Sequence, residues 1–235
     1  VRYKGYERKD SMKKGGTHMP YELWMAAAIP VIVAGGTLHF KMKEQSDKRW
    51  NILPKCLSTW MIVCTAALGV YLNGNEQSSV WILYATCFFF FADAFLEIHF
   101  FLGMIVFAIG HFLLIGWLIV QRHITIAVLP VWLTGMMITL ILFRKEISEG
   151  KKNPKIYLMI LYPAVLMAMM AMAVTLPFIA GWKYGWASVG ALLFSISDMM
   201  VGKGFFKKLP KKLDYWALAL YYCGIFCLSM MTWAI

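Results

Sequence analysis

The sequence predicts an all-α membrane protein, a polytopic helix bundle with about eight transmembrane helices. Hydrophobic residues make up 60% of the 235 residues and charged residues only 15%, which leaves too few polar side chains to cover a soluble domain of this length. The apolar residues are grouped into runs of roughly 20, the length that an α-helix needs to cross a bilayer. Transmembrane strands do not fit, because their residues alternate between lipid and lumen.

Eight apolar runs are the predicted spans, and we expect them to form a single transmembrane domain over residues 21–235. The second and seventh runs are short. The sixth contains Pro163 and Pro177, so we expect that helix to be kinked or to end early. The predicted spans are residues 21–40, 56–72, 80–98, 101–120, 124–143, 156–180, 184–202 and 213–232.

A basic, polar tail formed by residues 1–20 precedes the first span. It has no apolar core, so we expect no cleavable signal peptide. A trimmed or engineered end is one interpretation of the Val at position 1.

The distribution of Lys and Arg predicts which helix ends face the cytoplasm. The connections 41–55, 144–155 and 203–212 carry five basic residues each and fall on one side of an eight-helix arrangement, whereas the opposite connections carry only Arg122 and Lys183. Because cytoplasmic loops are enriched in Lys and Arg, we expect the three basic connections in the cytoplasm. The tail disagrees, since its six basic residues would lie outside. This bias accounts for the net charge of +11 without a nucleic-acid partner.

Two aspartates inside apolar runs, Asp93 and Asp198, are the main functional signal. An ionisable residue within a span is costly and therefore indicates a functional site. Both stretches read Phe, three residues, Asp, six residues, Phe-Phe, and they are four helices apart, so they favour two parallel four-helix repeats. The matched phenylalanines are Phe89, Phe100 and Phe101 in the first copy and Phe194, Phe205 and Phe206 in the second.

The predicted topology places both aspartates at a similar depth. Asp93 and Asp198 lie about five residues before the cytoplasmic ends of their helices, which is roughly 6–8 Å. Lys55 enters from the same side at the start of the second span, and His111 lies about halfway along the fourth. We therefore expect four polar residues from four helices to face one cavity.

A pair of buried carboxylates suits general acid–base hydrolysis, because one carboxyl can act as an acid while the other stays ionised. The same pair suits proton coupling in a transporter. Each aspartate could instead be satisfied by a helix–helix hydrogen bond or a nearby cation. An intramembrane aspartyl protease also uses two aspartates, but no Gly-x-Gly-Asp is present.

Other polar residues allow structural and functional interpretations. Lys55 either anchors a helix end or binds an anionic head group, and His111 either packs or relays protons. Glu97 shares a face with Asp93, yet its position near the boundary favours a solvated role. One hydroxyl of Tyr221 and Tyr222 could reach the core. The five cysteines lie in or beside apolar runs without metal-ligand spacing, so no metal or cofactor is predicted.

These residues occur in the order of a known set of motifs. A Lys-x-Leu-Ser/Thr-Thr opens one helix, a small residue and Asp close the next, Phe-x-x-Gly and His follow, and Leu-Phe-x-x-Ser-Asp comes late. In this order the chain resembles the YhhN-like membrane family, which includes the animal lysoplasmalogenases, over about residues 55–222. The motif residues are Lys55, Leu57, Ser58, Thr59, Ala92, Asp93, Phe100, Gly103, His111, Leu193, Phe194, Ser197 and Asp198.

The chain departs from the family pattern at three places. Ala92 stands where the family usually has Gly, and Cys56 stands where it usually has Pro. No Gln follows shortly after the pair Tyr221 and Tyr222.

The resemblance implies hydrolysis of the vinyl ether bond of lysoplasmalogen to a fatty aldehyde and a glycerophospho-alcohol. Asp93 and Asp198 would be the catalytic acid and base, without an assignment of which is which. Lys55 would bind the phosphate as a point charge, and His111 would hydrogen-bond an aspartate or the glycerol. The further candidates for substrate binding are Ser58 and Tyr222.

The implied partners are a lysophospholipid substrate and membrane lipids, with no metal and no nucleic acid. The protein would lie in a bacterial cytoplasmic membrane or the endoplasmic reticulum, with its site toward the cytoplasmic leaflet. The alternative from another class is a proton-coupled transporter of lipids or small solutes that uses the same two aspartates. A non-catalytic lipid-binding or scaffold relative is a further interpretation.

Overall fold

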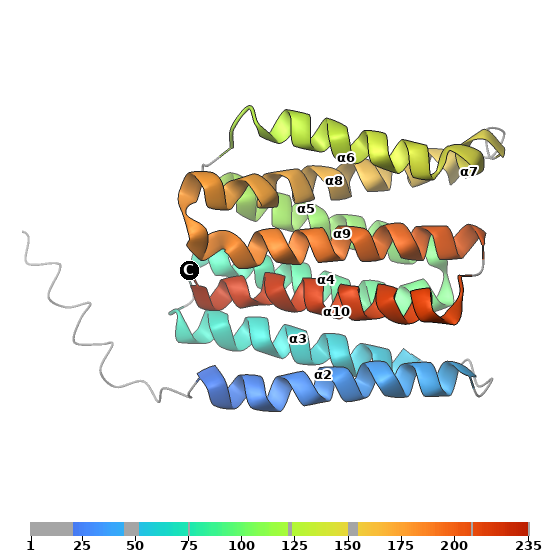
Figure 1. The fold of residues 1–235 in the computed structure, drawn as a ribbon. Helices are drawn as coiled ribbons and strands as arrows, with labels where there is room; N and C mark the ends of the chain where they lie inside the picture. Colours follow the sequence, from blue (N-terminus) through green and yellow to red (C-terminus); the bar gives the residue numbers. More distant parts are fainter. Residues whose placement is uncertain are drawn as a thin grey trace, which may run out of the picture.

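The computed structural model describes residues 21–44, 52–74, 76–121, 124–149, 155–207 and 209–234. Every regular element in these ranges is a helix, which confirms the predicted all-α class (Figure 1). Seven helices of the described ranges are long and apolar enough to cross a membrane, so the chain is a multi-pass integral membrane protein. They are α2 (Tyr21–Glu44), α3 (Ile52–Leu72), α4 (Gln77–Ile98), α5 (Phe100–Val120), α8 (Lys155–Ala180), α9 (Gly185–Phe206) and α10 (Lys211–Ala234).

Three shorter elements lie between the long helices. The apolar helix α6 (Val128–Leu142) corresponds to the fifth predicted span but has only 15 residues. Helix α7 (Arg144–Glu149) follows it, and the 3-10 helix η1 (Trp182–Tyr184) connects α8 to α9. The predictions about the tail, residues 1–20, fall outside the described residues.

Some helices extend beyond the predicted spans at their basic ends. Helix α9 ends at Phe206 rather than 202, so Asp198 lies eight residues, or roughly 12 Å, before the helix end. Helix α3 begins at Ile52, which puts Lys55 inside its first turn. Lys203 of α9 stays partly exposed near this end, so its long side chain can reach toward water, whereas Lys55 is buried.

The prolines of the sixth predicted span do not end its helix early. Helix α8 is one element from Lys155 to Ala180 with Pro163 and Pro177 inside it. Neighbouring helices can satisfy the backbone groups that a proline frees inside a membrane protein.

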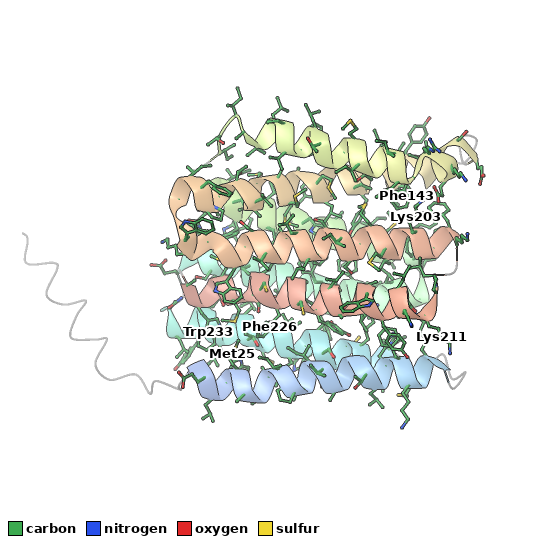
Figure 2. The ribbon with its side chains drawn as sticks, viewed as in Figure 1. Met25, Phe143, Lys203, Lys211, Phe226 and Trp233 are labelled. Carbon is green, nitrogen blue, oxygen red and sulfur yellow. The ribbon has the colours of Figure 1, made fainter. Side chains whose placement is uncertain are left out.

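The seven long helices and α6 lie side by side, and each of these eight helices runs opposite to the one before it in the chain, so their connections gather at two ends of the bundle (Figure 1). Lys203 and Lys211 lie at one end, whereas Met25 and Trp233 lie at the other (Figure 2). We call the end that carries Lys203 and Lys211 the basic end.

The helix contacts of the first and second halves correspond. Helix α3 packs against α4 and α4 against α5, just as α8 packs against α9 and α9 against α10. Between the halves, the last helix of each half contacts the second helix of the other. These contacts are α5 with α8 and α10 with α3. This is the pattern that a duplicated four-helix unit predicts.

Phenylalanines that match in the two copies meet where the two halves contact each other. The rings of Phe89 and Phe194 lie 5.1 Å apart, and those of Phe100 and Phe205 stack at 4.0 Å with an interplanar angle of 13°. Offset stacks of this kind add to the energy of burial. The repeated letters of the sequence therefore occupy corresponding positions on the two sides of the central contact.

Two glycines let the paired helices of each half approach closely. A Cβ atom at Gly110 of α5 would collide with the ring of Phe89 on α4. A Cβ atom at Gly224 of α10 would lie 2.7 Å from the backbone nitrogen of Phe194 on α9. Each glycine thus faces the phenylalanine that lies one turn before an aspartate.

We expect Gly224→Ala to destabilise the bundle by about 1–3 kcal/mol, because the added methyl group meets backbone rather than a movable side chain. The apparent Tm in detergent should fall by several degrees. Gly185→Ala is the matched control, since nothing lies within 4 Å of a Cβ atom there and the backbone is helical. Equal Tm values for the two variants would contradict this packing.

Candidate functional site

A polar cavity of about 120 Å³ lies toward the basic end between α2, α3, α4, α9 and α10. It brings together three of the residues that the sequence singled out, Lys55, Asp93 and Asp198. The other polar residues that line it are His39, Lys43, Glu97, Ser197, Asp214 and Tyr221.

Lys55 links two carboxylates inside the bundle. Its Nζ atom lies 3.4 Å from Oδ1 of Asp93 and 3.2 Å from Oε1 of Glu97. Lys55 and Asp93 are only 6% and 1% exposed, so neither charge can rely on water. Glu97 is exposed, as its expected place near the boundary implies, and its side chain also pairs with Lys55.

Two hydroxyl groups complete the surroundings of Asp93. The Thr59 hydroxyl donates to Oδ2 of Asp93, and the Tyr221 hydroxyl donates to the same oxygen at 2.9 Å. Thr59 follows Lys55 by four residues, so both project from one face of α3. One ammonium group and two hydroxyl donors therefore stabilise the ionised form of Asp93.

Asp198 has different neighbours. Its carboxylate accepts a hydrogen bond from the Tyr162 hydroxyl of α8, and no ion pair among the described residues involves it. His111 does not contact an aspartate directly, since its Nε2 lies 3.4 Å from the hydroxyl of Tyr162. Because that hydroxyl donates to Asp198, we assign the hydrogen of His111 to Nε2, which leaves Nδ1 without a protein partner.

The two aspartates occupy equivalent places in the two halves. Thr59 of α3 donates to Asp93 of α4, and Tyr162 of α8 donates to Asp198 of α9. Within the described part of the chain, only the first half supplies a lysine to its aspartate. The cavity therefore combines a carboxylate that is paired with a cation and a second carboxyl group that is not.

Asp198 also borders an apolar pocket of about 40 Å³ between α5, α8 and α9. The wall of this pocket includes Phe100, Met104 and Met199. The carboxyl group thus lies between polar surroundings on one side and apolar surroundings on the other.

Two predicted substrate-binding residues do not line the polar cavity. The Ser58 hydroxyl has the carbonyl oxygens of Ile32 and Pro54 as acceptors at 3.0 and 3.3 Å. The Tyr222 hydroxyl donates to the carbonyl oxygen of Lys55 at 3.3 Å. These bonds satisfy buried hydroxyl groups within the helix packing.

Sequence reasoning missed Tyr162 and gave no site role to Thr59, a motif residue, or to Tyr221, one of two tyrosines that could reach the core. Thr59 lies one helical turn after Lys55 and therefore shares its face. Tyr221 and Tyr222 are adjacent, so their side chains leave α10 in directions about 100° apart, and the choice between them needed the orientation of α10. Nothing in the neighbouring sequence connects Tyr162 with Asp198.

Comparison with known proteins identifies one family. A model of the YhhN family matches residues 50–232, which include α3 to α10 and leave α2 outside. No curated protein and no solved structure matches the chain.

Removal of the Lys55 ammonium group should strongly destabilise the protein. We expect Lys55→Met to cost about 3–5 kcal/mol, because it leaves the buried Asp93 carboxylate without its cation. The double variant with Asp93→Asn should regain much of this loss. The measurement is the apparent Tm of each purified protein.

Lys43→Met is the matched control for that cycle. Lys43 also pairs with a carboxylate, Asp214, at 2.8 Å, but the two side chains are 47% and 42% exposed. Exposed ion pairs contribute little, so this variant should remain close to the parent in stability. A double variant as unstable as Lys55→Met alone would contradict the assigned pairing.

Proposed function

Because the chain belongs to the YhhN family, we propose that it is a membrane-embedded hydrolase of the vinyl ether bond of lysoplasmalogen. The products are a fatty aldehyde and a glycerophospho-alcohol. One observation carries the proposal, namely that Asp93 and Asp198 line one cavity in chemically different surroundings. Such a difference suits a reaction that needs a proton donor and an anion together.

The proposed reaction consumes one water molecule. A proton adds to the vinyl carbon that is remote from the oxygen, and the double bond becomes an oxocarbenium ion. Water adds to the cationic carbon and loses a proton, which forms a hemiacetal. The bond between that carbon and the glycerol oxygen then breaks, the oxygen takes a proton, and the aldehyde is released.

We assign Asp198 as the acid and Asp93 as the base. Asp198 has no cation partner among the described residues and borders an apolar pocket, which favours a carboxyl group that holds a proton. Asp93 is kept ionised by Lys55, so it stabilises the oxocarbenium ion and accepts a proton from the attacking water. The pair Tyr162 and His111 orients the Asp198 carboxyl group.

The structure changes the role that we give to Lys55. Its ammonium group is already engaged by Asp93 and Glu97, so we propose that it holds Asp93 ionised instead of binding the phosphate. The phosphate would then lie at the basic end of the bundle, where Lys43 lines the rim of the cavity.

The test is aldehyde release from purified protein in detergent supplied with a 1-alkenyl lysophospholipid. We expect release to fall by at least about a hundredfold in Asp198→Asn and in Asp93→Asn, because each variant removes one partner of the acid–base pair. In deuterated water the aldehyde should carry one deuterium on the carbon beside its carbonyl, since the proton that Asp198 donates comes from solvent.

Two controls show whether a change in aldehyde release reflects the proposed reaction, one with a variant protein and one with a substrate analogue. Glu76→Gln removes an exposed carboxyl group at the start of α4, far along the helix from Asp93, and should leave the rate unchanged. The saturated ether analogue should release nothing. Well-folded protein that produces no aldehyde would overturn the proposal, and uptake into sealed vesicles under a pH difference would then test the transporter alternative.

We further propose that the site faces the cytoplasmic leaflet, because the connections rich in Lys and Arg lie at the same end. Lys145 is exposed on α7, which lies at the basic end (Figure 1), whereas Glu76 is exposed at the start of α4, the end of that helix remote from Asp93. In sealed vesicles with the cytoplasmic side inward, an impermeant maleimide should label Glu76→Cys at once. Lys145→Cys should react only after permeabilisation, and the reverse result would contradict the orientation.

A further inference from the structure

An apolar groove of about 440 Å³ runs between α2 and α10. Its volume lies in the range of ligand pockets, roughly 300–1,000 Å³. The groove is open on the lipid side, because Val33 and Cys223 in its wall are exposed. Helix α2, which forms one side of it, lies outside the region that the family model matches.

The length of the groove corresponds to one leaflet. Its lining residues extend from Phe40 to Ile29 on α2 and from Tyr215 to Phe226 on α10. Eleven helical residues span about 16 Å, close to half of the roughly 30 Å hydrocarbon core. Phe226 lies between α10 and α2 toward the end opposite Lys211 (Figure 2), so the groove runs from the basic end toward the middle of the bundle.

The groove adjoins the polar cavity of the candidate site. Phe40 and Leu218 line both of them. The Phe40 ring packs against Tyr215 with 3.9 Å between ring centroids, and Lys43 pairs with Asp214 at 2.8 Å beside them. The polar cavity and the apolar groove are therefore neighbours that share Phe40 and Leu218 in their walls. An amphipathic ligand requires a polar space and an apolar space side by side in this way.

We propose that this groove holds the single hydrocarbon chain of a lysophospholipid from the cytoplasmic leaflet, an inference that rests on the proposed function. The chain lies along α2 and α10, and its first carbons lie beside Phe40, where the bond to be cleaved meets the polar cavity. The pocket beside Asp198, at about 40 Å³, is too small to hold such a chain.

The affinity comes from the polar end of the ligand. Surrounding lipid is as apolar as the groove, so a hydrocarbon chain gains little by moving from one to the other. The polar cavity selects the head group, and the groove fixes the direction in which the chain leaves it.

Cys223 provides a reporter that does not depend on catalysis. It is exposed in the groove wall, whereas the other four cysteines are partly or fully buried. The experiment measures maleimide labelling of Cys223 in nanodiscs of diacyl phosphatidylcholine. The probe is a lysophospholipid with a saturated ether chain, which cannot undergo vinyl ether hydrolysis. At about ten times its Kd, labelling should slow about tenfold by mass action.

A matched pair of variants tests the location of the chain. Val33→Trp fills the groove and should abolish the protection of Cys223 by the lysophospholipid. Val189→Trp adds the same bulk on the lipid-facing side of α9, where the side chain is 46% exposed, and should keep it. Glycerophosphocholine, which lacks the chain, should give no protection.

The outcomes separate this inference from the proposed hydrolysis. Protection that is absent, or that survives Val33→Trp, overturns the groove assignment even if aldehyde is released. Protection that follows the expected pattern while no aldehyde forms supports the groove as a lysophospholipid site and overturns only the hydrolysis. In active protein, Val33→Trp should raise KM for the alkenyl substrate about tenfold or more, whereas Val189→Trp should not.

Discussion

The contact between the Lys55 ammonium group and the carboxylates of Asp93 and Glu97 governs the rest of the site. A charge in the apolar part of a membrane protein is tolerated only when a partner or water compensates it. Here the Lys55 ammonium group and the two carboxylates compensate one another. The hydroxyl groups of Thr59 and Tyr221 also donate hydrogen bonds to Asp93. The positions of α3, α4 and α10 relative to one another are therefore tied to this one electrostatic requirement.

The same requirement explains why the two aspartates differ chemically. Asp93 and Asp198 occupy corresponding positions, and each accepts a hydrogen bond from the helix that precedes its own. The difference comes from Lys55, which forms an ion pair with Asp93 and, among the described residues, none with Asp198. A single cation thus gives two carboxyl groups at corresponding positions different electrostatic surroundings, and the proposed hydrolysis depends on this difference.

Much of the fold could be predicted from the sequence because membrane helices leave a strong signal. Long apolar runs located the spans, and the basic connections grouped the helix ends that lie together. The spacing of Phe89 and Phe194 from the aspartates indicated the repeat. The helix ends were less certain, because hydropathy cannot tell that Lys203 continues α9 as a helical residue.

The sequence predicted a site residue only where the residue type was itself unusual within a membrane span. Asp93, Asp198 and Lys55 are conspicuous because charges are rare in spans. Thr59, Tyr162 and Tyr221 are common residue types in apolar helices, and their importance follows from which helix faces which. Tyr221 and Tyr222 line different spaces, because a single step along a helix turns a side chain from the cavity toward the groove.

The central contacts between Phe89 and Phe194 and between Phe100 and Phe205 have a consequence for how such a site can arise. A symmetric dimer of identical four-helix subunits would bring the same rings together. Both aspartates would then have identical neighbours, and neither would be favoured as the holder of a shared proton. Joining the two units in one polypeptide removes that constraint, because each half can change its surroundings independently. The covalent link between the halves therefore allows a division of labour that exact symmetry would forbid.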